Sequence, residues 1–394
     1  MERVDLLIEK YKETVLEHYR WLHAHPELSG QEKESAAYIA AALRKMGLEP
    51  VENVGGYGVT AVIEGKGEGK CVGLRADFDA LPILEKTGLP FASENPGVMH
   101  ACGHDAHAAM LLGAAYVLNE MKGEFNGKVK LLFQPSEENS ADSGSKRMIA
   151  DGALENPHVD AVIGQHVGCA RSVGMVASKP GTMSAYSDSF KIIIEGKACH
   201  ASAPHNGVDA LLVGAQIVTA LQSIVARNVA PLKSCVVTVG KMTAGDRYNV
   251  LAGHCEIHGT CRNHDAAVRD LAEKRIESIA RGIAEGMGAS CTVNYIRGYA
   301  PVINNEEMYA LWKETAAELL GEDNVKLIAN AGLGGEDFSF FAEQVPGIFF
   351  HLGCKTEGGK NAPAHNEGFM PNTDGFVTGQ RVMVTTALKY LAKN

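Results

Sequence analysis

Hydrophobic positions recur at helical spacing at the start of the chain and then alternate between helical and strand-like segments. Residues 3–25 carry apolar side chains three or four positions apart, which predicts an amphipathic helix. A second helix is predicted over 31–46, because Ser29 followed by Glu32 is typical of a capping box. Strands are then expected at 58–63, 71–74, 129–133 and 160–163, with a helix at 106–122. This alternation favours the α/β class, with helices on both faces of a central sheet.

The pattern changes at about residue 186. Up to residue 298 it predicts the order strand, helix, strand, strand, helix, strand, at 189–195, 208–227, 235–239, 254–262, 266–287 and 290–296. That order is typical of a compact α+β unit of the ferredoxin-like type. The first pattern then resumes, with a helix at 306–320, a buried strand at 347–352 and a last helix at 374–391. Since single cores stop growing at about 250–300 residues, we expect a discontinuous domain, 1–185 and 299–394, with an inserted domain at 186–298.

Composition narrows the possible partners and the compartment. The formal net charge of −10 argues against nucleic acid, because no basic field meets the phosphates. The longest apolar run, 108–118, is shorter than the ~20 residues that a bilayer requires, and the charged start shows no signal-peptide pattern. The nine cysteines are scattered singly, as in reduced proteins. We therefore expect a cytoplasmic protein that binds neither nucleic acid nor membrane.

The stretch from Met99 to His107 concentrates groups that bind metals or move protons. Cys102 and His104 are two positions apart, so they cannot share a helix face, but Gly103 allows a turn in which both converge. A strong helical pattern follows, and Asp105 is expected as its N-cap. Taken alone the stretch is a weak signal, because cysteine is often simply buried and histidine has many roles.

Further metal-binding side chains follow the predicted strands. In open α/β sheets, sites form beyond the carboxyl ends of the strands, and the groups found there are Asp77 and Asp79, Glu137 and Glu138, His166, and His365. Each one alone is commonly a turn former or cap, but together with Cys102 they favour a metal cluster. A metal lowers the pKa of a bound water from ~15.7 to about 7. In the Glu137–Glu138 pair, one carboxylate can then bind metal while its neighbour moves the proton of that water.

At this point the chain resembles the aminoacylase/carboxypeptidase family of metal-dependent amidohydrolases, in the branch with hippurate hydrolase and the indoleacetyl-amino-acid hydrolases. The matching motifs are Arg75–Pro82, Met99–His107, Gln134–Glu138, Gly164–His166, Gly196–Ser202, Gly335–Phe338 and His365. They extend from the first quarter of the chain to near its end, so the resemblance covers the whole chain.

The resemblance implies a metallopeptidase-like catalytic domain that holds two divalent metals per subunit. The implied ligands are Cys102, His104, Glu138, His166 and His365. Glu137 would be the general acid and base, and Asp79 would support the site. Cysteine favours zinc, but carboxylates and imidazoles also suit manganese, cobalt or nickel.

The resemblance also implies that the inserted domain dimerises and covers the active site, which predicts a homodimer or a dimer of dimers. His200 would reach the partner's site, and Asn249 and Arg262 would help bind substrate; the alternative for these residues is ordinary turn or strand-end structure. The Gly-rich loop around Gly334 precedes a short predicted helix and suits the substrate's carboxylate. It is equally consistent with a simple linker.

The function expected from these features is hydrolysis of N-acyl amino acids to a carboxylic acid and a free amino acid. A dipeptidase or carboxypeptidase on the same metal site is the first alternative. A non-catalytic metal-binding protein is less favoured, because it has no use for Glu137 beside a ligating Glu138. A serine hydrolase is disfavoured because the chain has no Gly-x-Ser-x-Gly turn.

Overall fold

The computed structural model describes residues 2–359 and 361–393 and divides into two compact units. The first unit contains the chain up to Met183, Val302–Asn330 and the stretch from Asp337 onward. The second contains Ser184–Pro301 and the loop Ala331–Glu336.

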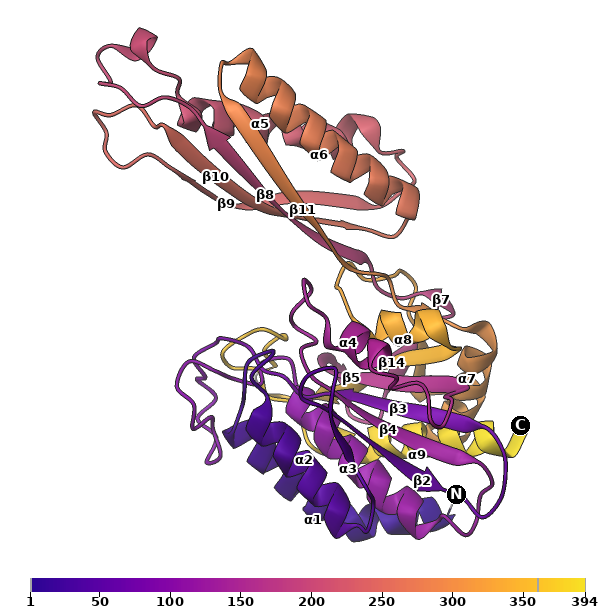
Figure 1. Ribbon diagram of the computed structural model, residues 1–394. Helices are drawn as coiled ribbons and strands as arrows, with labels where there is room; N and C mark the ends of the chain where they lie inside the picture. Colours follow the sequence, from indigo (N-terminus) through magenta and orange to yellow (C-terminus); the bar gives the residue numbers. More distant parts are fainter. Residues whose placement is uncertain (1, 360, 394) are drawn as a thin grey trace. The chain divides into compact units, whose positions relative to one another are not determined.

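The first unit is built on an eight-stranded sheet with the order β1-β2-β4-β3-β5-β14-β6-β13 (Figure 1). Its strands are β1 (Val51–Val54), β2 (Gly58–Glu64), β3 (Cys71–Asp77), β4 (Lys128–Gln134), β5 (Ala161–Ser172), β6 (Val176–Ser178), β13 (Val325–Leu327) and β14 (Gly347–Lys355). The central strands β4, β3, β5 and β14 are parallel neighbours. Their carboxyl ends therefore meet at one edge, where a site is expected. A small separate ladder pairs β7 (Gly181–Thr182) with β12 (Ile303–Asn304).

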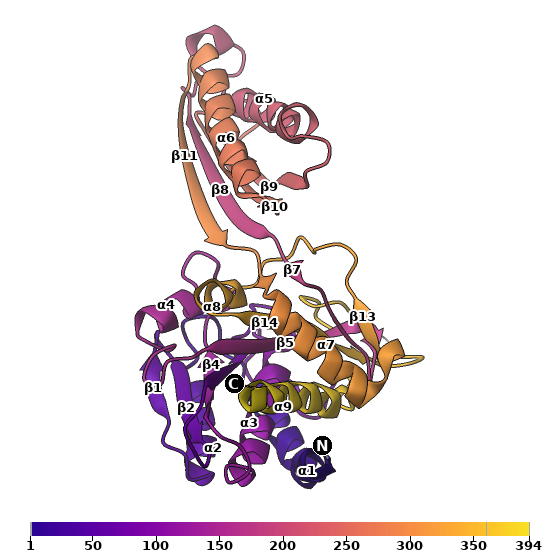
Figure 2. The same cartoon turned by 90° about the vertical axis from the view of Figure 1, so that its right-hand side faces the viewer.

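Helices cover both faces of this sheet (Figure 2). They are α1 (Glu2–Ala24), α2 (Lys33–Lys45), α3 (His104–Glu120), α4 (Gly144–Ala150), α7 (Glu306–Leu320), α8 (Phe338–Gln344) and α9 (Gly375–Lys393). Successive strand residues point to opposite faces, so on β4 Leu131 and Phe133 join the core under α1, α3 and α9, while Leu132 packs in the core that includes Phe338 and Phe341 of α8. The predicted α/β class, with helices on both faces, is confirmed.

The second unit is an antiparallel sheet of order β11-β8-β10-β9 with two helices on one face (Figure 1). The strands are β8 (Tyr186–Glu195), β9 (Cys235–Ala244), β10 (His254–Asn263) and β11 (Ser290–Tyr299), and the helices are α5 (Ala210–Ser223) and α6 (Ala266–Gly286). The chain order strand, helix, strand, strand, helix, strand is the predicted one. Its own core brings Ile192 and Ile257 of the sheet against Ile217 of α5 and Ile276 of α6.

One described segment, Ala210–Asn228, is long and apolar enough to cross a membrane by length and composition alone. It consists of α5 and a π turn, Ile224–Asn228. Val213 and Ile217 on its inner side belong to the core of the second unit, so one face of the segment packs against that core.

Candidate metal centre

The parallel strands deliver acidic and imidazole groups to one edge of the sheet. β3 ends at Asp77, and Asp79 follows it; β4 ends three residues before Glu137. β5 carries His166 as its sixth residue and pairs it with His351 of β14. Because these strands are parallel neighbours, side chains far apart in the sequence come together here.

Cys102 lies in a tight turn that opens α3. Gly103 has a φ of 91°, and a Cβ built on it would lie 2.4 Å from the Val167 side chain, so only glycine fits at this position. The helix begins at His104 with Gly103 as its N-cap residue, so the predicted N-cap role of Asp105 is wrong. Asp105 lies in the first turn instead, where its carboxylate contacts His23 and accepts the Ala106 N–H.

The five predicted ligands come together in two groups that share Cys102. The first group is Cys102, His104 and His166, and the second is Cys102, Glu138 and His365; within each, the candidate ligand atoms lie within 4.8 Å of one another. Cys102 Sγ is 3.3 Å from His166 Nε2. Glu138 Oε1 is 3.1 Å from His365 Nε2. The shared thiol makes the five side chains one continuous donor cluster.

His365 reaches the cluster through its backbone. Its N–H donates to the carbonyl of Ala101 at 2.7 Å, next to Cys102 in the sequence. Its φ of 64° is uncommon for a residue other than glycine. The late loop is therefore tied to the turn before α3 despite a separation of more than 260 residues.

Asp79 orients His104 and links it to the loop that follows β4. His104 Nδ1 lies 3.0 Å from the Asp79 carbonyl oxygen and 3.1 Å from its carboxylate, so this nitrogen carries a proton. The other Asp79 oxygen accepts from Ser29 Oγ and from the Glu138 N–H. The predicted capping box is wrong, because Ser29 binds Asp79 and the first N–H groups of α2 donate to the carboxylate of Glu27 instead.

The donor set of the cluster fits a metal. His104 Nε2 is buried and has no hydrogen-bond partner, and a metal would satisfy this orphaned nitrogen. A thiol, imidazole nitrogens and a carboxylate are the ligands of zinc and its first-row neighbours. The histidine–carbonyl contact behind His104 is the usual support for such a ligand.

The charges within the cluster are mutually stabilising. Burial raises the pKa of the Cys102 thiol, but the charges of His166 and His104 lower it by more than burial raises it. The resulting pKa is about 6. Burial lowers the pKa of His166, while the thiolate raises it to about 9. Hydrogen bonds to Cys102 and Glu138 raise the pKa of His365 to about 10. These shifts favour a thiolate beside imidazolium groups in the metal-free cluster, and metal binding would release the imidazolium protons.

Glu137 lies beside the cluster and outside both groups of three. One of its oxygens is 4.0 Å from His104 Nε2, and the side chain is buried. It also lies within the same short range of Glu138.

The candidate residues of the second unit fall at two ends of its sheet. His200 and Asn249 are neighbours, because His200 forms a bridge with Val250 and Ala201 donates to the Asn249 carbonyl. Arg262 stands eight residues along β10 from His254, near the other end of that strand. The carbonyl of Gly334 accepts the Ala185 N–H beside β8, at the same end as Arg262.

A buried polar network lies behind the predicted ligands, and the sequence analysis did not predict it. It connects Arg75, Asp77, His107, Gln134 and Asp337. Two features of the sequence could have indicated the network. One is the charged Arg75 directly after the apolar predicted strand 71–74, and the other is His107, three residues after His104. Neither signal identifies partners as remote as Arg75 and Asp337.

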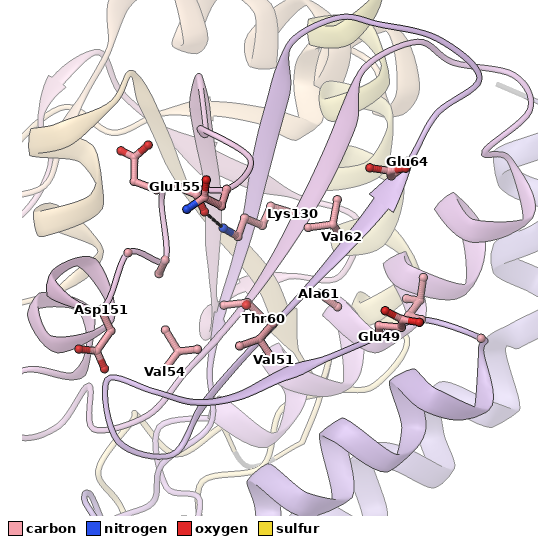
Figure 3. A pocket seen from close by; sticks show the side chains of 15 residues that line it. Glu49, Val51, Val54, Thr60, Ala61, Val62, Glu64, Lys130, Asp151 and Glu155 are labelled. Atoms are coloured by element: carbon pink, nitrogen blue, oxygen red, sulfur yellow. Dashed lines mark hydrogen bonds between the residues drawn. The ribbon is translucent and has the colours of Figure 1, made fainter.

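A pocket of about 570 Å³ in the first unit shares no residue with the cluster (Figure 3). β1, β2 and the segment 151–156 line it, and Lys130 in its wall donates to the Glu155 carbonyl. It contains neither histidine nor cysteine. The pocket therefore contributes no side chain to the donor cluster.

The fold and the cluster define a metal-dependent hydrolase. The model of the peptidase family M20/M25/M40 matches residues 73–389, and the chain belongs to this family. It is 39% identical over 376 residues to the N-acetyl-L-cysteine deacetylase of Bacillus subtilis, covering 95% of this chain and 88% of that protein. It is 36% identical to thermostable carboxypeptidase 1 of Saccharolobus solfataricus, covering 98% and 100%.

A solved structure agrees with this assignment. The Bacillus subtilis YXEP protein, described as a dinuclear metal-binding peptidase of the M20 family, superposes with a TM-score of 0.81 at 31% identity, over 98% of this chain and 100% of that one. The family resemblance and the enzyme class expected from the sequence are confirmed. The roles of individual residues stay predictions.

Proposed function

We propose that this protein hydrolyses the amide bond of N-acyl amino acids, and that Glu137 moves the proton. The observation that carries the proposal is Glu137 beside the five-residue cluster, buried and within 4.0 Å of His104 Nε2. The deacetylase relative supports an acyl substituent on the amino acid. The carboxypeptidase relative supports the alternative, a dipeptidase or carboxypeptidase. In that case the acyl group of the substrate is an aminoacyl group, so that the substrate is a peptide.

Two divalent metals would be held by the two groups that share Cys102. When bound, they would polarise the amide carbonyl and make water nucleophilic near neutral pH. Thiolate ligation favours zinc, while manganese, cobalt and nickel are also compatible with this mixed donor set.

Glu137 is proposed to take a proton from the attacking water and to give it to the leaving nitrogen. This transfer requires a carboxylate that does not ligate metal, next to one that does. Glu138 fills the ligating role, since its carboxylate lies 3.1 Å from His365 Nε2. Adjacent carboxylates on one loop thereby divide metal binding from proton transfer.

Arg262 and the loop around Gly334 are proposed to bind the substrate's free carboxylate. They lie at the same end of the second unit, where Arg262 pairs across the sheet with Ser187. A guanidinium matches a carboxylate in charge and geometry. Asn249 is proposed to contact the substrate together with His200.

His200 is proposed to serve the site of a second copy in a homodimer. Eight residues of β10 separate Arg262 from His254, roughly 27 Å at the usual rise of a strand, and His200 lies beyond that end. A small substrate cannot touch both ends of one unit. Two copies related by a two-fold axis can supply both ends to one site.

The surface of the second unit supports a homodimer. Leu211 and Leu212 of α5 are each 47% exposed, and Val225 in the π turn is 39% exposed. β9 is the last strand at one edge of the sheet, and an open edge can pair with a second chain.

All nine cysteines are free thiols, which supports the proposed cytoplasmic location.

Mixing inactive variants tests whether His200 acts across the interface. We expect His200→Ala and Glu137→Ala each to be inactive alone, and activity to return after subunit exchange, because each mixed dimer regains one intact site. Verified mixed dimers without recovered activity would refute the trans arrangement.

The central test of the proposal compares Glu137→Gln with Glu138→Gln. We expect Glu137→Gln to lower kcat by about 10²–10⁴-fold on N-acyl amino acids while metal content stays at the wild-type level. Glu138→Gln should lose metal. Near-normal turnover by Glu137→Gln would remove the basis of the proposal. Parallel assays with acetyl-, benzoyl- and indoleacetyl-amino acids and with dipeptides separate the leading function from its alternative.

A further inference from the structure

His104 and His107 lie on the first turn of α3, three residues apart, and both are fully buried. Residues at this spacing share a helix face. Ligand atoms of His104, His107 and Asp77 also lie within 4.8 Å of one another, as a metal site would require. Proximity alone would therefore make His107 a sixth ligand.

The hydrogen bonds of His107 exclude that role. Its Nδ1 lies 2.5 Å from an Asp77 carboxylate oxygen, and its Nε2 lies 2.9 Å from the backbone nitrogen of Val167. A backbone N–H can only donate, so Nε2 accepts and the ring proton is on Nδ1. His107 is thus a neutral ring with both nitrogens engaged, and it has no lone pair left for a metal.

Asp77 is fixed in turn by a buried arginine. Arg75 Nη1 donates to the second Asp77 oxygen at 2.7 Å. Nη2 and Nε of the same guanidinium donate to Asp337 and to Gln134, both also at 2.7 Å. All of these side chains are buried. Buried charges persist only when they are paired and hydrogen-bonded, so Asp77 holds one orientation toward His107.

Through its other ring nitrogen, His107 holds the backbone at Val167, next to the predicted ligand His166. The ladder between β3 and β5 ends at the pair Arg75 and Gly164. Three residues further along β5 than Gly164, the N–H of Val167 donates to His107 Nε2. His166 Nδ1 donates to the carbonyl of Val167 at 2.7 Å, and its Nε2 faces Cys102 Sγ at 3.3 Å. The residue that orients the His166 ring is therefore the residue whose amide His107 fixes.

We propose that His107 is a positioning residue for His166, with Asp77 and Arg75 holding it in the tautomer that accepts the Val167 N–H. The proposal rests on the metal-dependent function above. It assigns to the second histidine of the Met99–His107 stretch the task of orienting a ligand from another strand. Supports of this kind are typically worth 10–100-fold in metal affinity.

The decisive group is the acceptor at the Nε2 position, and two substitutions separate it from the rest of the ring. In His107→Gln the side-chain oxygen can reach the position of Nε2 and accept from Val167. In His107→Asn the shorter amide can occupy only the position of Nδ1 toward Asp77. His18→Asn is the matched control, because His18 is a buried histidine of the same unit that bonds Tyr38 instead of the network.

The test is a titration of the metal-free full-length variants with Co²⁺, followed by visible absorption. We expect His107→Asn to raise the Kd for Co²⁺ by about 10–100-fold and to change the thiolate and d–d bands. His107→Gln should restore both close to wild type, and His18→Asn should leave both unchanged. Chemical unfolding of the metal-free proteins provides the measure of folding.

The outcomes distinguish this proposal from the proposed function. If His107→Asn binds Co²⁺ as wild type does, or His107→Gln loses as much affinity as His107→Asn, the positioning role is refuted while the metal centre stands. If the wild type binds no Co²⁺, both are refuted. A loss of affinity in His107→Asn that merely follows the unfolded fraction also overturns the positioning role.

Discussion

Two buried histidine–carboxylate pairs flank the start of α3, and they differ in charge. In one, His107 contacts Asp77 at 2.5 Å; in the other, His23 contacts Asp105 at 2.6 Å. The difference lies at the second nitrogen of each ring. His107 Nε2 accepts a backbone N–H, whereas His23 Nε2 lies 3.1 Å from the carboxylate of Glu85.

The second partner therefore decides the protonation state of each ring. Burial lowers the pKa of His23, but hydrogen bonds to Asp105 and Glu85 raise it to about 9, so this ring is a cation at neutral pH. His107 is neutral, because a ring nitrogen that accepts a hydrogen bond carries no proton. A carboxylate at one nitrogen is thus insufficient to charge a buried histidine in this protein.

The largest expected effect comes from removing the carboxylate of each pair. Asp77→Asn leaves the buried Arg75 without one of its ionic partners, and we expect the free energy of unfolding to fall by about 3–5 kcal/mol. Asp105→Asn should cost less, about 1–3 kcal/mol, because His23 keeps Glu85 and, unlike Arg75, can lose its proton when a carboxylate is removed. Urea unfolding of the metal-free proteins at pH 7 measures both values. An Asp105→Asn variant that costs as much as Asp77→Asn would contradict the different roles of the two pairs.

Periodicity and strand order made much of the fold and the ligand cluster predictable. Of the predicted ligands, Glu138 follows β4, Cys102 comes just before α3 and His166 lies within β5, and the parallel order of β4, β3 and β5 brings these segments together. His365 was expected at this edge of the sheet because it follows the predicted strand 347–352, and the resemblance implied that it is a ligand. Its position depends on a φ of 64° and on a backbone bond to Ala101, and neither follows from a hydrophobic pattern.

The wrong expectations share one physical cause. Ser29 and Asp105 are good capping residues by type, but each binds a partner remote in sequence, Asp79 and His23 respectively. A buried long-range hydrogen bond competes with a local cap, and the sequence shows only the local option. The same reason concealed the link between Arg75 and Asp337, which are 262 residues apart.

The pH dependence of stability sharpens the comparison further. The pKa of His23 is raised from 6.5 to about 9 in the folded protein. Its protonation therefore stabilises the fold fully below pH ~6.5, and this contribution is lost as the pH rises toward 9. The shift corresponds to at most about 3 kcal/mol. His107 adds nothing to this alkaline slope, because it is already neutral.

Measuring the free energy of unfolding from pH 6 to pH 10 tests this second effect. We expect the wild type to lose more stability across that window than His23→Gln does, by up to about 3 kcal/mol, which is the contribution of His23. His18→Gln is the control on the same helix, because burial lowers the pKa of His18 to about 4. A histidine of that kind loses its contribution as the pH falls below ~6.5, so its removal leaves the alkaline slope unchanged. Parallel wild-type and His23→Gln profiles between pH 6.5 and 9 would show that His23 is not the cation its two carboxylates require.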